Sequence, residues 1–152
     1  MHPRRFALIG GLIMLAIGAL AFVPALSQYP TWLPRLNVET SYGQFLGLVV
    51  MNVFTKVALI AFGIAGILAS RAPTTSLPSS IKWSRWVFFV MAPLAVLGLV
   101  PATNTLFGYW PIFGNHVWVS GIFAVLGAYF GFALPARAKA ALPEDKNRIR
   151  AA

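Results

Sequence analysis

The sequence predicts an all-α polytopic membrane protein, with four transmembrane helices arranged as two hairpins and both termini in the cytoplasm. The first observation is composition: 59% of the 152 residues are hydrophobic and only 10% are charged, whereas about 25% of residues are charged in soluble domains. The second is a series of four long apolar segments, which approach the length of about 20 residues that spans a bilayer. The third is that basic residues lie at the ends of these segments, as they do in membrane proteins.

The first predicted hairpin has helices at residues 6–26 and 43–70. Its first helix follows a basic stretch that ends at Arg5. The apolar run is longer than the core of a signal peptide, so we expect a helix that is not cleaved. A polar connection with Pro30 and Pro34 separates the two helices, because proline interrupts helical hydrogen bonding.

The second predicted hairpin has helices at residues 86–100 and 117–134. The stretch before it, residues 71–85, is rich in Pro, Ser and Thr and is expected to be a loop. Residues 101–116 contain helix-breaking glycine and proline together with aromatic side chains, which predicts an interfacial or re-entrant segment. The chain therefore divides into a transmembrane domain, residues 1–134, and a basic cytoplasmic tail, residues 135–152.

Basic residues outside the apolar segments fall almost entirely on one side of the predicted bundle. Arg35 alone lies on the other side. Because cytoplasmic loops of membrane proteins are enriched in Lys and Arg, this asymmetry places both termini and the middle loop in the cytoplasm. The following basic residues are expected to contact lipid headgroups: Arg71, Lys82, Arg85, Arg137 and Lys139.

Lys56 is the main candidate for a functional residue, because it lies within the predicted helix 43–70. A lysine near the bilayer centre costs about 2.5–3.5 kcal/mol on insertion scales, so it must face protein or water. Asn52 and Thr55 fall on a polar face that Lys56 borders. Three interpretations stay open: a lysine hydrogen-bonded to Asn52, Thr55 and backbone carbonyls, a contact to a carboxylate of another subunit, or part of an ion path.

Small residues predict close helix packing. Gly127 and Gly131 form a G-x-x-x-G spacing in the last helix, and Gly63 lies on the polar face of the second. Such residues let helix backbones approach closely in a membrane.

The residues available for chemistry are few. The chain has no cysteine, three carboxylates outside the predicted helices and two histidines, so no catalytic set can be named and the chain is predicted not to be an enzyme. His116 is a candidate axial ligand for a haem or pigment, although one histidine at a helix start more often makes interfacial hydrogen bonds; the cofactor is otherwise unknown. The net charge is +9, but the basic residues do not alternate with aromatic residues along one stripe. This distribution argues against nucleic-acid binding.

Most of the chain resembles a bacterial four-helix membrane family known only as a domain of unknown function. The resemblance rests on a Pro–Asn–Thr–Leu–Phe–Gly type loop, a Gly–Asn–x–x–Trp helix start and two positions of the second helix. These residues are Pro101, Asn104, Thr105, Leu106, Phe107, Gly108, Gly114, Asn115, Trp118, Asn52 and Gly63. The chain departs from the family's histidine-containing pattern at Thr55, Lys56, Leu59 and Ser120.

The resemblance implies a multi-pass protein of the bacterial plasma membrane and brings no known activity. We therefore expect a non-catalytic accessory or structural subunit, in contact with the lipid bilayer and with other membrane subunits. The alternatives are a small transporter or channel that uses Lys56, and a pigment- or haem-associated subunit.

Overall fold

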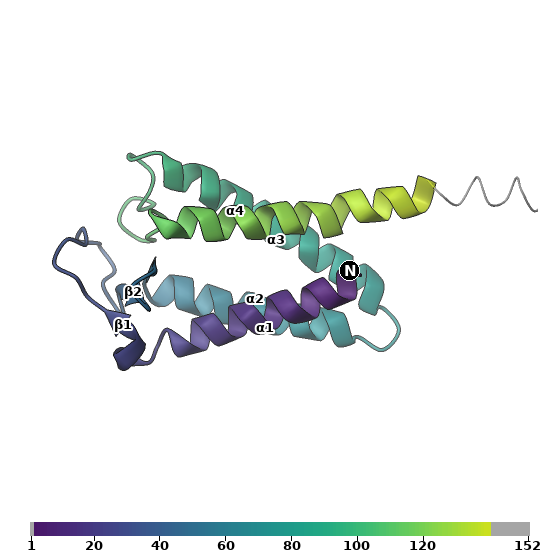
Figure 1. The fold of residues 1–152 in the computed structure, drawn as a ribbon, viewed down its shortest axis with the longest axis horizontal. Coiled ribbons are helices and arrows are strands. Elements are labelled where there is room, and N and C mark those ends of the chain that lie inside the picture. Colours follow the sequence, from purple (N-terminus) through teal and green to yellow (C-terminus); the bar gives the residue numbers. More distant parts are fainter. Residues whose placement is uncertain (1, 141–152) are drawn as a thin grey trace, which may run out of the picture.

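The computed structural model describes residues 2–140 and shows four long helices that meet loops and a small sheet at one end (Figure 1). The helices are α1 (Pro3–Leu20), α2 (Val53–Arg71), α3 (Ser76–Leu99) and α4 (Asn115–Ala128). A π-helical turn, η2 (Tyr129–Ala133), continues α4, and the chain stays helical to Ala140. All four helices are long and apolar enough to cross a membrane, which confirms the predicted class of a multi-pass helical membrane protein.

The four helices form two hairpins, α1 with α2 and α3 with α4. The start of α1, the turn between α2 and α3, and the far end of α4 all lie at the same end of the bundle (Figure 1). We call this the basic end, because it carries Arg4, Arg5, Arg71, Arg137 and Lys139. Both limits of the described chain are therefore at one end, as expected for an even number of crossings.

The opposite end is closed by a cap made of residues 21–52 and 100–114. The cap contains a short helix, η1 (Pro24–Leu26), and three strands, β1 (Ser27–Gln28), β2 (Gly43–Phe45) and β3 (Val49–Met51). The strands pair antiparallel in the order β1-β2-β3, with Ser27 opposite Phe45 and Gly43 opposite Met51. A small apolar core beneath them joins the two segments of the cap through the following residues: Leu33, Leu36, Tyr42, Val50 and Phe113.

The largest difference from the prediction lies in residues 43–52, which were expected to begin the second helix. They form β2, a turn and β3 instead, and Gly47 adopts a φ of +69° in the turn. The helix begins only after Asn52, whose side chain accepts a hydrogen bond from the backbone N–H of Thr55 at 3.3 Å. This side-chain hydrogen bond satisfies one of the N–H groups that a helix start leaves unpaired. The apolar run is therefore divided between the strands β2 and β3 and the helix α2.

Other helix boundaries also differ from the prediction. The first helix ends at Leu20 rather than residue 26, and α4 starts at Asn115 rather than residue 117. The third starts at Ser76 rather than residue 86, so most of the expected loop 71–85 is helical. Ser84 explains part of this result: its hydroxyl donates to the Ser80 carbonyl at 2.8 Å, so the side chain is hydrogen-bonded within the helix by sharing the carbonyl one turn back.

The predicted tail, residues 135–152, is helical as far as Ala140. The last helix therefore continues without a break past residue 134, where the transmembrane domain was predicted to end. Residues 141–152 of the tail lie outside the described part of the chain.

One apolar core holds the two hairpins together near the basic end. Phe6 of α1 stacks on Phe130 of η2 with ring centroids 4.7 Å apart, and it lies 5.5 Å from the ring of Trp83 of α3. The Trp83 indole N–H donates to the Phe62 carbonyl of α2 at 3.0 Å. These contacts fix one hairpin against the other at this end, whereas nearer the cap the hairpins enclose a cavity.

Candidate functional site: the cap and the cavity below it

Lys56 lies in the first turn of α2, close to the cap, because the helix starts at Val53. It is therefore not at the middle of a long helix as the sequence predicted. Its side chain is 2% exposed, and its Nζ donates to the Ser41 hydroxyl at 2.8 Å. The same Nζ lies 5.2 Å from the centroid of the Phe22 ring. Lys56 is thus enclosed by two residues of the cap.

Asn52 and Thr55 pair with each other rather than with Lys56. The Thr55 hydroxyl lies 3.4 Å from Asn52 Oδ1, and Asn52 Nδ2 donates to the Tyr109 carbonyl at 2.7 Å. The polar group expected around Lys56 is therefore split: Lys56 bonds to Ser41 of the first cap segment, whereas Asn52 bonds to the Val38 carbonyl of the first segment at 3.4 Å and to the Tyr109 carbonyl of the second.

Three asparagines join the first cap segment to the second segment and to the start of α4. Besides Asn52, Asn37 donates through Nδ2 to the Phe107 carbonyl at 3.0 Å, and Asn115 donates to the Leu48 carbonyl at 3.0 Å. The backbone of Asn37 also donates to the Gly108 carbonyl at 2.8 Å. Each amide bonds to a backbone carbonyl far away in sequence, at separations of 57, 70 and 67 residues.

Gly108 fits this junction for two reasons. Its φ is +87°, a backbone conformation that favours glycine, and a Cβ there would come within 2.9 Å of the Asn37 amide. Asn52, Gly108 and Asn115, which carry part of the family resemblance, therefore have a structural part in closing the cap.

Tyr42 shows how tightly the cap is packed. It is 7% exposed, and its hydroxyl donates to the Pro34 carbonyl at 3.1 Å. Burial, followed by the nearby Tyr29 and Glu39, raises the pKa of Tyr42 to about 12. The phenol thus stays protonated and keeps donating its hydrogen bond through the neutral pH range.

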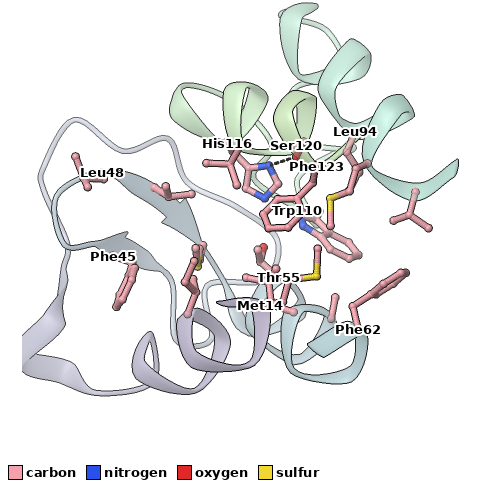
Figure 2. Close-up of a pocket in the computed structure, with 18 of the residues that line it drawn as sticks. Met14, Phe45, Leu48, Thr55, Phe62, Leu94, Trp110, His116, Ser120 and Phe123 are labelled. Atoms are coloured by element: carbon pink, nitrogen blue, oxygen red, sulfur yellow. Dashed lines mark hydrogen bonds between the residues drawn. The ribbon is translucent and has the colours of Figure 1, made fainter. Parts of the chain in front are cut away.

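Beneath the cap, all four helices surround a cavity of about 300 Å³. Figure 2 shows it between His116, Ser120 and Phe123 of α4 on one wall and Met14 and Thr55 on the other, with Trp110 of the cap projecting between them. The remaining lining residues are almost all apolar: Ile17, Phe45, Leu46, Leu48, Val49, Met51, Ala58, Leu59, Phe62, Val90, Met91, Leu94 and Val119.

The few polar groups in the cavity wall are mostly paired. Thr55 bonds to Asn52, and the Ser120 hydroxyl lies 3.1 Å from Nδ1 of His116. The exception is Trp110: its Nε1 is buried and has no hydrogen-bond partner in the described part of the chain. Buried indole N–H groups usually find a partner, and leaving such a donor unpaired costs about 1–3 kcal/mol.

His116, the candidate axial ligand, is 7% exposed and lies in the wall of this cavity. The cavity volume is at the lower limit of small-molecule pockets. This volume suits a compact molecule and is small for the flat macrocycle of a haem or chlorophyll-type pigment.

The predicted packing glycines all contact helices of the same chain. A Cβ at Gly63 would lie 2.5 Å from the Leu15 backbone nitrogen of α1, and one at Gly127 would lie 2.8 Å from the Phe88 nitrogen of α3. Gly131 packs against Arg85 in the same way. These small-residue faces therefore pack the two helices of each hairpin against each other.

The five basic residues expected at lipid headgroups are all exposed, and two of them have further contacts. Arg85 donates through Nε to the Gly131 carbonyl at 2.9 Å, and its guanidinium lies 5.1 Å from the Phe132 ring centroid. Arg71 lines a second hollow at the basic end together with Arg4 and Arg5.

The comparisons with known proteins place the chain in a family and add no activity. Residues 4–133 match the model of a family described as Domain of unknown function (DUF4383). No curated protein and no solved structure matches the chain. Since the family model covers most of its length, the chain belongs to this family.

The sequence analysis did not identify Trp110 or the cavity. Trp110 belongs to the aromatic segment that was assigned to the interface, and nothing in a single sequence separates an indole that faces lipid from one that faces inward. The proline and glycine on either side of it, Pro111 and Gly108, gave a signal for irregular backbone only.

Proposed function

We propose that this chain is a non-catalytic membrane protein that binds a small apolar molecule carrying one hydrogen-bond acceptor, such as a carbonyl group. The observation that supports the proposal is the unpaired Trp110 Nε1 at the wall of an otherwise apolar cavity. An apolar pocket with a few directed polar groups is the usual form of a small-molecule site. A carbonyl oxygen would satisfy the indole N–H, and the apolar body of the ligand would fill the cavity.

Water is a poor occupant of this cavity. A buried water needs two to four polar partners, whereas the wall is almost entirely apolar and its Thr55, Ser120 and His116 side chains each already have one hydrogen bond within the protein. An organic carbonyl needs only the one free donor, and its apolar part gains about 25 cal/mol for each Å² removed from water.

The test compares two ligands of nearly equal shape, 2-acetylnaphthalene and 2-ethylnaphthalene. The full chain is purified in detergent with ¹⁵N-labelled tryptophan, and the indole N–H resonances are followed during titration. We expect the ketone to bind about fivefold more tightly than the hydrocarbon, which is the effect of about one net hydrogen bond, and to shift the Trp110 resonance downfield.

Two variants identify the donor. Trp110→Phe keeps an aromatic ring and removes the N–H, so the preference for the ketone should disappear while the hydrocarbon still binds. Trp118→Phe makes the same change at a tryptophan that is 70% exposed on α4, and it should leave the preference intact. The proposal fails if neither ligand perturbs any indole resonance, or if Trp110→Phe retains the preference.

An accessory-subunit function remains the competing hypothesis. Its sequence support came from the lack of a catalytic set, the small-residue faces, the aromatic outer loop and a possible partner for Lys56. Of these, Lys56 bonds to Ser41 and the glycines pack on neighbouring helices of the same chain. Purification in a gentle detergent distinguishes the two hypotheses, because a stoichiometric partner protein would favour the subunit. A transporter that uses Lys56 is less well supported, since Lys56 is not among the residues that line the cavity.

A further inference from the structure

A second hollow lies at the basic end, at the opposite end of the bundle from the cap. It has a volume of about 690 Å³ and is formed by the start of α1, the end of α2 and the start of α3. Three of its lining residues are arginines, Arg4, Arg5 and Arg71, and no acidic side chain lines it within the described residues. Arginines far apart in sequence are thus gathered around one open pocket.

The placement of two of these arginines is unfavourable unless an anion is present. Arg4 and Arg5 lie in the first turn of α1, which contains no acidic residue. The start of a helix carries a partial positive charge, so cations are disfavoured and anions are favoured there. Arg71 is in the last turn of α2, where its charge is favourable, and it adds a third positive group to the same hollow.

Hydroxyl groups complete the polar part of the wall. Ser70 and Ser76 are 5% and 9% exposed, and both line the hollow. Thr75, the residue before α3, makes no side-chain capping hydrogen bond. The Ser70 and Ser76 hydroxyls therefore lie near a helix start that has no side-chain cap. Guanidinium groups bind phosphate oxygens through paired N–H donors. The Ser76 hydroxyl can add a neutral donor, whereas the Ser70 hydroxyl donates to the Ile67 carbonyl at 2.7 Å.

Besides His2, the remaining lining residues are apolar, and they favour a lipid over a free anion. Leu8 and Leu77 line the hollow beside the arginines. Ile9 and Leu12, which follow Leu8 along α1, are 46% and 49% exposed and continue the apolar surface away from the hollow. A phosphate held by the arginines would therefore have a hydrocarbon-facing surface directly next to it.

We propose that this hollow binds the phosphate of an anionic glycerophospholipid, with Arg4, Arg5 and Arg71 around the headgroup and the acyl chains along α1. This site is separate from the cavity below the cap and does not depend on the function proposed for it. Basic pockets between membrane helices are a recurring form of anionic lipid site.

The test is native mass spectrometry of the full chain in detergent, titrated with dioleoylphosphatidylglycerol or dioleoylphosphatidylcholine. We expect one tightly retained phosphatidylglycerol per chain and at least tenfold weaker retention of phosphatidylcholine. Each lost arginine should weaken phosphatidylglycerol binding by about fivefold, which is the contribution of one basic side chain at an anionic surface. Arg4→Gln combined with Arg71→Gln should therefore weaken it by about 25-fold.

The matched control for a single Arg4→Gln change is Arg35→Gln, which removes the same charge from an exposed residue of the cap, at the opposite end of the bundle from the hollow. It should change binding by less than about twofold. If the first double variant does not fold, Arg4→Lys with Arg71→Lys keeps the charge and removes the paired donors, and it should still weaken binding several-fold. Inorganic phosphate and glycerol 3-phosphate serve as soluble competitors and should not displace the lipid at equal concentration.

Three results would overturn the proposal. Equal losses in the pocket and control variants would mean that only overall surface charge matters. Equal retention of the two lipids would show that the anionic headgroup is not recognised. Displacement by inorganic phosphate or glycerol 3-phosphate at concentrations equal to the lipid would assign the hollow to a free anion.

Discussion

The environment of Lys56 depends on where its helix begins. In a helix running from residue 43 to 70 it would lie near the bilayer centre, but Asn52 caps α2 and places Lys56 in the first turn. A cation is disfavoured at a helix start, and here the Ser41 hydroxyl and the face of the Phe22 ring offset that cost. The residue is thus explained by the cap, which belongs to the same chain.

We predict that Ser41→Ala destabilises the protein by about 1–3 kcal/mol, because it leaves the buried Lys56 amine without its hydrogen-bond partner. In a Lys56→Met background the same change should cost less than about 0.5 kcal/mol, since no amine remains to be satisfied. Denaturant unfolding in detergent micelles measures both values. An equal loss of stability in the two backgrounds would show that the hydrogen bond between Lys56 and Ser41 does not contribute to stability.

At the level of elements, the sequence predicted the number and order of the helices but not their ends. Hydrophobicity counts apolar residues, and it cannot separate the strands of residues 43–51 from the helix that follows them. The boundary between β3 and α2 depends on the side-chain hydrogen bond of Asn52 and on backbone hydrogen bonds between the strands. A 3.6-residue periodicity of apolar residues does not reveal either of them. Likewise, the serines of residues 76–84 indicated a loop, although hydroxyls such as that of Ser84 bond to helix carbonyls.

Close contact between α1 and α2 depends on Gly63. We predict that Gly63→Ala lowers the free energy of unfolding by about 1–3 kcal/mol, because the added methyl would press on the backbone of Leu15. Gly121→Ala is the control: a Cβ there meets nothing within 4 Å, and alanine should gain up to about 1 kcal/mol through its higher helix propensity. Thermal unfolding of both variants in the same detergent provides the comparison, and a similar loss in both would contradict the packing argument.

At the level of the whole molecule, the cavity is the part that the sequence could not predict. Its walls come from all four helices and from the cap, and its volume depends on how far apart the two hairpins lie below the Phe6–Trp83–Phe130 core. The direction of the Trp110 indole depends on the path of an irregular segment. The basic end, by contrast, follows from charge placement, because the arginines lie where the apolar runs start and stop.

The positive-inside rule predicts that the basic end faces the cytoplasm, so both termini should be cytoplasmic. Fusion of a fluorescent reporter that is active only in the cytoplasm after Ala152 should give signal, and a periplasmic phosphatase at the same position should give none. A phosphatase inserted after Arg35 of the cap should be active. An active phosphatase after Ala152 would reverse the orientation.

The asparagine bonds across the cap have a consequence for the order of biogenesis. Asn52 donates to Tyr109, and Leu48 accepts from Asn115, so each bond joins the first hairpin to residues that the ribosome adds much later. We therefore expect these two bonds to form only after the second hairpin has been made. Until then water takes the place of the missing partners, and the wall of the cavity is incomplete.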